Sequence, residues 1–414
     1  MKPIRVGVFG AQRGVAFMET TLANNGEVVA ICDKNPKTYD GCLSLLPYTP
    51  ALYTDFDEFI QHDMDAVILC NSFHEHVPFA IKAMERGLHV MSECLSNSTM
   101  AEGVELVRAV EKSHSIYMLA ENYPYMLFNQ EMARVARGGT LGKIIYAEGE
   151  YNHPIDLDDT QVIQGLWPYS THWRNYCPRS YYLTHSLAPL IAATGAIPKR
   201  VSAMPVFAPN DEFSVVGRMH GDRATIMTCL NDDDSVFKIV GCSAFGAHGN
   251  SYRLCGTKGQ IENLRGMGDT IMLRYNDWEI PEGMQEVNQY TPEWPEDIRE
   301  DASKAGHGGG DFFVVREFFD CIRGLRKPFF DVYRATAMAS VAILAHRSVL
   351  NGNIPYDIPD FRKEEDRLLW ENDHETPFHY ADGRTPTIPC GSRPDYHTPE
   401  DKRNNYLRFV GELE

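Results

Sequence analysis

The sequence has few basic residues, no long apolar run and no paired cysteine motif. Its 414 residues include 39 Lys and Arg against 57 Asp and Glu, a formal net charge of −18. Nucleic acids and anionic membranes require a cationic face, so we expect neither as a partner. No stretch approaches about twenty consecutive apolar residues, and the first predicted strand begins too early for a signal peptide to precede it. We therefore expect a cytoplasmic protein.

The ten cysteines lie singly and include no Cys-x-x-Cys pair, as is typical of reduced cysteines in a cytosolic protein. His74-Glu75-His76 groups residues of metal-binding type. It offers only two histidines in a loop, with no further ligand cluster, so we interpret it as a turn that lines a cofactor. The acidic stretch Asn231–Asp234 is interpreted as a hairpin turn. We predict no metal site.

The first 33 residues have the pattern of a dinucleotide-binding βαβ unit. The apolar run Ile4–Phe9 predicts a buried parallel strand, Gly10 begins a tight turn, and residues 15–22 follow at helical spacing. A second predicted strand over residues 27–31 leads to Asp33. In such units the pyrophosphate lies over the helix N-terminus and the acid binds the ribose. Asp33 would repel a 2′-phosphate, which favours NAD over NADP.

The glycine fingerprint is incomplete. Counted from Gly10, a GxGxxG pattern requires glycine where Gln12 and Val15 stand, and Gly14 comes one position early. An ordinary strand-to-helix turn is therefore an alternative for this stretch alone. The predicted cofactor-binding residues of the unit are Gly10, Gln12, Arg13, Gly14 and Asp33.

Further repeats of strand, edge loop and helix fill residues 1–122, which predicts a complete doubly wound parallel sheet. Three of its strands run into polar turns that contain Asn71, Glu93, and Glu121 with Asn122. Ligands of open α/β sheets lie at this carboxyl edge. We therefore predict an NAD-binding Rossmann domain over residues 1–122.

Beyond residue 122, strands follow one another without intervening helices. This indicates an α+β substrate and oligomerisation domain over residues 123–360, with a large, mostly antiparallel sheet. Two apolar helix faces, within 312–322 and 338–345, are spaced closely enough for the helices to pack as neighbours. Residues 361–414 are charged and rich in proline, and we expect this C-terminal extension to wrap a surface or a partner subunit. The predicted strands span residues 144–151, 201–207, 214–219, 224–230, 236–243 and 252–255.

Tyr182 and His185 are the first candidates for catalysis. They lie three positions apart at a predicted helix start, so both can face one side. Histidine and tyrosine can exchange protons with an alcohol near neutral pH, which hydride removal requires. From these residues alone, a helix-capping histidine is an equally good interpretation. Tyr151 and His153, at the end of a strand, form a second pair, for which a solvated histidine is the alternative.

The chain resembles the Gfo/Idh/MocA oxidoreductase family over about residues 4 to 370. The resemblance rests on the first glycine turn, the run 71–93 with His76 at the family's histidine position, the turns 141–143 and 256–259, and the closing helices. The family usually has Glu-Lys-Pro where this chain has Glu93-Cys94-Leu95, and that lysine is normally a catalytic residue beside the nicotinamide.

The other site residues are similar to the NAD-dependent glycosidase branch of that family, typified by certain α-N-acetylgalactosaminidases, which also lacks the lysine. In that branch NAD transiently oxidises a ring hydroxyl, the ketone acidifies the neighbouring C–H, and the glycosidic oxygen leaves by elimination; water then adds and the hydride returns. The resemblance implies that His185 is a base or relay. It places Tyr182, Tyr151 and His153 around the sugar, and Glu121 and Glu93 near the nicotinamide.

We thus predict an NAD-dependent oxidoreductase that acts on a sugar or glycoside by hydride transfer at a secondary ring hydroxyl. The alternative is a redox-type glycoside hydrolase with tightly bound NAD. A third hypothesis, motivated by the missing lysine, is a non-catalytic sugar or nucleotide sensor. The resemblance also implies a homodimer or homotetramer formed through the sheet of the second domain.

Overall fold

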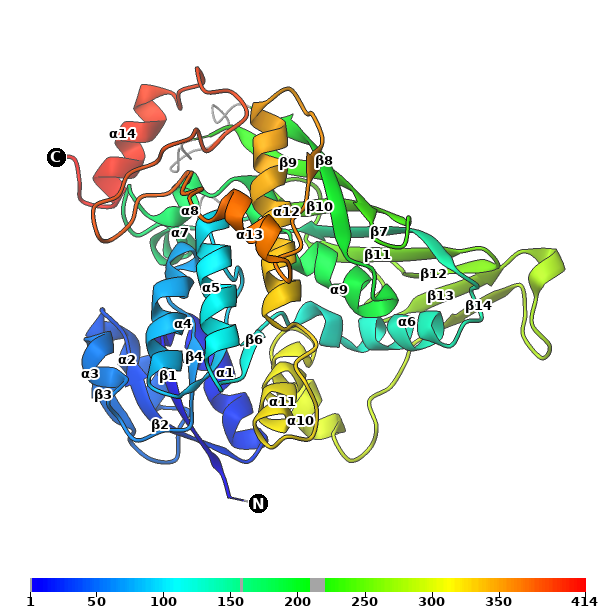
Figure 1. Cartoon of the computed structure of the whole chain (residues 1–414), viewed down its shortest axis with the longest axis horizontal. Helices are drawn as coiled ribbons and strands as arrows, with labels where there is room; N and C mark the ends of the chain where they lie inside the picture. The colour runs from blue at the N-terminus through cyan, green and yellow to red at the C-terminus, as the bar shows by residue number, and fades with distance from the viewer. Residues whose placement is uncertain (1, 157–158, 209–219) are drawn as a thin grey trace.

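A six-stranded parallel sheet forms the N-terminal layer of the protein. The computed structural model describes residues 2–156, 159–208 and 220–414 (Figure 1). The strand order is β3-β2-β1-β4-β5-β6. The chain adds strands to one side of β1 as far as β3 and then, from β4, to its other side, so a topological switch point lies at the carboxyl ends of β1 and β4. The strands are β1 (Ile4–Phe9), β2 (Gly26–Cys32), β3 (Ala51–Tyr53), β4 (Ala66–Leu69), β5 (His89–Ser92) and β6 (Tyr117–Leu119).

Helices cover both faces of this sheet, which is why a strand such as β4 is apolar at every position and fully buried. One of these helices, α5, begins with a capping box in which Thr99 and Glu102 each bind the other's backbone N–H. The predicted doubly wound fold is therefore confirmed. In chain order, the helices of this part of the fold are α1 (Ala11–Ala23), α2 (Tyr39–Leu43), α3 (Phe56–Phe59), α4 (His76–Glu85) and α5 (Met100–Lys112).

Within the described residues, a second sheet of nine strands has the order β14-β13-β12-β11-β7-β10-β9-β8-β15. Its pairs are antiparallel except β10 with β7, so the mostly antiparallel prediction is confirmed. The strand predicted over residues 214–219 lies outside the described residues. The strands are β7 (Ile144–Asn152), β8 (Pro198–Phe207), β9 (Asp222–Asn231), β10 (Val236–Ser243), β11 (Gly249–Gly256), β12 (Gly259–Asn263), β13 (Ile271–Tyr275), β14 (Val287–Tyr290) and β15 (Tyr356–Asp357).

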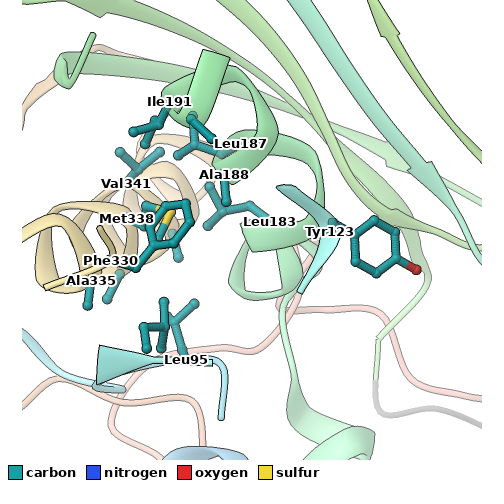
Figure 2. Packing of buried hydrophobic residues seen from close by; sticks show 14 of the residues in the cluster. Leu95, Tyr123, Leu183, Leu187, Ala188, Ile191, Phe330, Ala335, Met338 and Val341 are labelled. Atoms are coloured by element: carbon teal, nitrogen blue, oxygen red, sulfur yellow. The ribbon is translucent and has the colours of Figure 1, made fainter. Parts of the chain in front are cut away.

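Two helices join this sheet to the Rossmann domain. α9 (Thr184–Thr194) lies so close to β7 that a Cβ on Gly149 would come within 1.9 Å of the Ser186 carbonyl oxygen. Figure 2 shows side chains of α9 packed against those of α12 (Val332–Leu350), with Leu95, from the loop after β5, beneath them. One hydrophobic core therefore continues from the parallel sheet into the second domain.

The two late helices make their main contacts with other elements rather than with each other, which differs from the prediction that they pack as neighbours. α11 (Gly310–Ile322) instead packs against α1, and its Phe319 lies beside Gly26 at the start of β2. α12 packs against α5 and β8. Each helix buries its apolar face against a separate layer, and sequence spacing alone does not determine which layer that is.

The remaining helices are short and lie around these two sheets. None of the described helices is long and apolar enough to cross a membrane. They are α6 (Leu127–Arg137), α7 (Thr160–Leu166), α8 (Trp173–Tyr176), α10 (Arg299–Lys304), α13 (Glu364–Trp370) and α14 (Glu400–Phe409).

Candidate active site

A cavity of about 700 Å³ lies at the carboxyl edge of the parallel sheet. Its size is within the usual range for a cofactor or small-molecule site. Every strand end from β1 to β5 except that of β3 contributes to it, as does Asn122 after β6. The opposite wall comes from residues 165–174, together with Tyr182, His185 and His307.

The turn after β1 has the geometry that a dinucleotide requires. Gly10 has φ +95°, and a Cβ there would lie 2.3 Å from the carbonyl oxygen of Cys70, so the turn needs glycine. A Cβ on Gly14 would lie 2.4 Å from Cγ1 of Val8. Gly14 therefore permits the close helix–strand packing that the last glycine of the fingerprint normally provides. Gln12, at the middle glycine position, lines the cavity.

Polar groups around this turn suit the rest of a dinucleotide. Asp33 lines the cavity, and its two oxygens accept N–H groups from Ala11 and Asn35, which leaves each with capacity for a further donor. Among the described residues, the buried side-chain oxygens of Asn71 and Asn122 have no hydrogen-bond partner. Buried polar atoms of this kind fit a polar ligand that supplies the missing donors.

Arg13 crosses the cavity floor between two carboxylates. Its Nε lies 2.5 Å from Glu93 and one terminal nitrogen lies 3.2 Å from Asp311. Burial alone would raise the pKa of Asp311, but the hydrogen bond from His307 and the charge of Arg13 lower it below its usual value. Asn122 also donates to Asp311, at 2.7 Å, so one buried carboxylate orients three groups of the cavity.

Glu121 and His185 form a buried pair, of which His185 lines the cavity. Nδ1 of His185 lies 2.9 and 3.1 Å from the two oxygens of Glu121, which is fully buried. Although burial opposes ionisation, His185 and the hydrogen bonds from it and Thr184 lower the pKa of Glu121. The carboxylate therefore holds the proton of His185 on Nδ1 and leaves Nε2 as the nitrogen able to accept another.

Cys94 occupies the position where the resembling family has lysine. Its Sγ lies 3.1 Å from the second oxygen of Glu121. Burial and the adjacent Glu121 raise the pKa of Cys94 well above its usual value. Cys94 is thus a neutral hydrogen-bond donor to Glu121, and a cationic proton donor is missing at this point.

Aromatic rings surround the imidazole of His185. Tyr123 stacks on it with centroids 3.9 Å apart, and the rings of Tyr151 and Tyr182 meet it edge-on at 5.2 and 5.3 Å. Burial raises the pKa values of Tyr151 and Tyr182, which keeps both phenols protonated as donors. His153 stacks on Tyr151 at 5.4 Å. The four residues proposed from sequence for catalysis therefore lie together.

His153 is a second imidazole in this cluster. Burial, with the neighbouring His248 and Arg174, lowers the pKa of His153 to about 4. His153 can therefore accept a proton at neutral pH. The rings of His153 and His185 both contact the ring of Tyr151, the first stacked on it and the second edge-on.

The predicted residues fall into two groups by position. Gly14, Glu121, Tyr151 and His153 are not among the residues that line the cavity. The others line it directly: Gly10, Gln12, Arg13, Asp33, Asn71, His76, Glu93, Asn122, Tyr182 and His185. In the His74-Glu75-His76 turn, His74 binds the carbonyl of His379 and His76 that of Leu95.

Sequence reasoning missed a stack of aromatic rings that lines the cavity. Phe73 stacks on Trp173 with centroids 4.9 Å apart and on Tyr182 at 6.4 Å, and the Arg174 guanidinium lies over Trp173. His307 was also missed. The only local signal was the dense run His172-Trp173-Arg174, with three ligand-contacting residue types in one loop.

Comparison with known families agrees with this architecture. Residues 4–121 match the Gfo/Idh/MocA oxidoreductase family with its NAD-binding Rossmann fold, so the prediction of NAD as cofactor is confirmed. Residues 207–367 match the C-terminal domain of glycosyl hydrolase 109. Both predicted activities, sugar oxidoreductase and glycosidase, fit this combination.

Individual relatives cover most of the chain at low identity. The chain is 24% identical over 405 residues to an alpha-N-acetylgalactosaminidase of Shewanella oneidensis, covering 90% of this chain and 87% of the relative. It is 24% identical over 396 residues to a glycosyl hydrolase family 109 protein of Shewanella pealeana, covering 88% and 86%.

Solved structures share the fold. Levoglucosan dehydrogenase in complex with NADH and levoglucosan has a TM-score of 0.73 at 17% identity, covering 87% of this chain and all of that one. The scyllo-inositol dehydrogenase of Lactobacillus casei has a TM-score of 0.65 at 16% identity, covering 86% and 99%. Two regions of the chain thus match two family models, the NAD-binding domain of the Gfo/Idh/MocA oxidoreductases and the C-terminal domain of glycosyl hydrolase 109.

Proposed function

We propose that this protein is an NAD-dependent glycosidase that cleaves its substrate by transient oxidation, elimination and addition of water. The observation that carries the proposal is the presence of two imidazoles, His185 and His153, whose rings both contact the ring of Tyr151. Simple oxidation of an alcohol requires one proton acceptor. Elimination of a glycoside requires a second, because a proton must also leave the carbon beside the new ketone.

NAD, when bound, accepts the hydride of a ring C–H and later returns it. Nε2 of His185 takes the hydroxyl proton as the ketone forms and gives it back at the end. His153 accepts the proton from the neighbouring carbon, so the glycosidic oxygen can leave with its electron pair. The protonated phenols of Tyr151 and Tyr182 donate hydrogen bonds that orient the sugar.

Glu121 and Cys94 support this proton transfer without contacting the substrate. The carboxylate stabilises the imidazolium that forms on His185, as the aspartate does in a catalytic triad. The thiol of Cys94 keeps its proton at neutral pH, because its pKa is raised, and donates it only in a hydrogen bond to Glu121. Proton transfer is therefore assigned to the histidines rather than to a lysine.

The test is a panel of aryl glycosides of both anomers, with an aryl α-N-acetylgalactosaminide first because a relative carries that activity in its name. We expect phenol release without added NAD and without accumulation of NADH. In deuterated water, the sugar product should carry one deuterium on the carbon that lost its proton. Accumulation of NADH without phenol release would instead indicate a dehydrogenase and would overturn the proposal.

Variants separate the two imidazoles. His185→Asn should abolish both oxidation and cleavage, because the first proton has no acceptor. His153→Asn should still oxidise the bound sugar, since that step needs only His185. It should lose phenol release and deuterium incorporation. His114→Asn, an exposed histidine outside the cavity, is the matched control. Unchanged turnover in His185→Asn would show that the site assignment is wrong.

We also propose a homodimer or homotetramer that forms through the open face of the nine-stranded sheet. Residues of both charges, including Glu148, Lys238, Arg253 and Arg265, line a groove on that face. Mixed charges allow the same surface to pair with itself about a two-fold axis. Light scattering should give a multiple of 46.8 kDa, and charge reversal at Arg253 should lower it; a monomer would contradict the proposal.

Cytoplasmic location is proposed from the cysteines. In the described residues each of the ten is a thiol rather than half of a disulfide, which is typical of a reducing compartment. Cell fractionation should recover the protein with cytoplasmic markers. Recovery with an oxidising compartment would contradict this assignment.

A further inference from the structure

The chain after residue 367 lies outside both matched family regions, residues 4–121 and 207–367. It nevertheless returns to the dinucleotide cavity. Figure 1 shows the C-terminal segment and α14 beside α7 and α8, at the end of the Rossmann domain where α4 and α5 are seen. The segment contacts both walls of the cavity, at two separate places.

The first contact is made by Tyr406 of α14. Its side chain is fully buried against Ile163 and Trp167, in a small hydrophobic cluster separate from the two main cores. Its hydroxyl lies 2.8 Å from the carbonyl oxygen of Tyr169 and 3.2 Å from that of Trp167. Asn175, itself fully buried, donates to the same hydroxyl at 2.9 Å.

The segment that Tyr406 holds is a wall of the cavity. Gly165, Leu166, Pro168 and Tyr169 all line it. A Cβ on Gly165 would lie 3.8 Å from the side-chain nitrogen of Gln12, so this wall faces the glycine turn after β1. It therefore lies across the region where the pyrophosphate of a dinucleotide binds in this fold.

This wall has little stability of its own. α7 has seven residues and α8 has four, and helices this short are marginal without tertiary packing. Tyr406 supplies a large part of that packing, and Ser170 donates its backbone N–H to Glu412 at 2.9 Å. The position of the wall thus depends on α14 and the residues after it.

The second contact is made with the wall on the Rossmann side of the cavity, at the turn Phe73–Glu75 after β4. Phe378 is fully buried, with its ring 6.1 Å from Phe73 and 5.0 Å from His74. The His379 carbonyl lies 2.7 Å from Nε2 of His74, and Ala381 donates to Glu75 at 3.0 Å. The same segment of chain therefore holds both walls.

We infer that residues 368–414 form an internal strap that holds the two walls of the cavity together and slows the release of NAD, with Tyr406 as its main positioning residue. The strap contributes no group to the reaction. It acts by preventing the short wall around Tyr169 from opening. The inference depends on NAD binding and is independent of whether the substrate is a glycoside.

The test measures NAD release from the full-length protein. Tyr406→Phe, Tyr406→Ala and Asn175→Ala are loaded with NAD, diluted into NAD-free buffer, and the retained nucleotide is measured over time. Loss of the hydroxyl should speed release a few-fold and loss of the ring about tenfold or more, in line with the free energies of hydrogen bonds and buried aromatics. Tyr290→Phe is the control, because it removes from β14, in the other sheet, a hydroxyl that donates to Glu131 of α6. It should match the wild type.

A second readout excludes a general effect on folding. Limited proteolysis should cut the Tyr406 variants faster between residues 160 and 176. Their melting temperature should stay within a few degrees of that of the wild type. Asn175→Ala provides the same information from the other side if Tyr406→Ala does not fold. Unchanged NAD release in folded Tyr406→Phe and Asn175→Ala would overturn the inference. Because no glycoside is present, this result cannot be confused with failure of the proposed activity.

Discussion

Nδ1 of His185 lies within hydrogen-bond distance of both carboxylate oxygens of Glu121, at 2.9 and 3.1 Å. Glu121 follows β6 of the Rossmann domain, and His185 lies in the first turn of α9, which covers the second sheet. The pair therefore spans the junction of the two domains. Tyr252 adds a hydrogen bond from its hydroxyl to the backbone carbonyl of His185, at 2.5 Å.

Glu121→Gln should reduce kcat by on the order of 10²–10⁴-fold, the usual contribution of a positioned acid–base group. The amide carries no charge to stabilise the imidazolium and can present an N–H to Nδ1, which favours the wrong tautomer of His185. Phenol release measures the effect, and NAD content should stay normal. Glu131→Gln, on α6, is the matched control and should keep full activity. Activity of Glu121→Gln within twofold of wild type would exclude this role.

Cys94 should act through its hydrogen bond rather than through thiol chemistry. Cys94→Ser keeps a donor to Glu121, whereas Cys94→Val has a similar size and no donor. We expect the valine variant to lose about two- to tenfold in kcat, which corresponds to one hydrogen bond of about 0.5–1.5 kcal/mol. The serine variant should stay close to wild type. Equal losses in both variants would mean that the hydrogen bond is not the important property.

Gly14→Ala should destabilise the protein and weaken NAD binding. The new Cβ would lie 2.4 Å from Cγ1 of Val8, in the contact between α1 and β1. Overpacking of this kind costs about 1–3 kcal/mol, and it shifts the helix whose N-terminus faces the pyrophosphate. Urea denaturation and NAD titration measure the two effects. Gly41→Ala, where no atom lies within 4 Å of the added Cβ, should leave both unchanged.

The stability of the protein should fall as the pH decreases through the range where free histidine titrates. Burial lowers the pKa of His346 from 6.5 to about 4, and its Nε2 donates to the Pro389 carbonyl at 2.7 Å. Between these two values the unfolded chain binds more protons than the native one, so acid favours unfolding.

From about pH 7 to about pH 5, this one group should remove about 2 kcal/mol from the free energy of unfolding. His346→Gln keeps a donor for Pro389 and should flatten the decline by that amount, as measured by urea denaturation at the two pH values. His114→Gln, at an exposed position, should show the wild-type slope. A slope unchanged by His346→Gln would show that His346 does not carry the effect.

Much of the Rossmann domain could be predicted from local sequence. The run Ile4–Phe9 is the strand expected, and Gly10 is the glycine that the following turn requires. Polar residues at strand ends, such as Asn71 and Asn122, were expected near a cofactor because parallel strands share one carboxyl edge, and both line the cavity at that edge. Such patterns are readable because apolar runs and turn residues act over a few positions of the chain.

Other parts of the fold depended on contacts between distant residues. The short strands β12, β13 and β14 were not predicted, since strands of four or five residues carry little periodicity. The roles proposed for His185, Tyr182, Tyr151 and His153 stay predictions, although these side chains do lie together. Their approach depends on α9 lying against β7, where Gly149 permits it.

The sequence by itself determined most of the order of strands and helices in the Rossmann domain, the glycine turn and the identity of the proton-transfer candidates. Only the tertiary structure decided that Cys94 contacts Glu121, that Gly14 packs on Val8, and that Tyr406 returns to the cavity. The physical reason is that periodicity and turn chemistry are local properties. The contacts of a buried side chain depend on which surfaces remain available after the sheets and helices have packed.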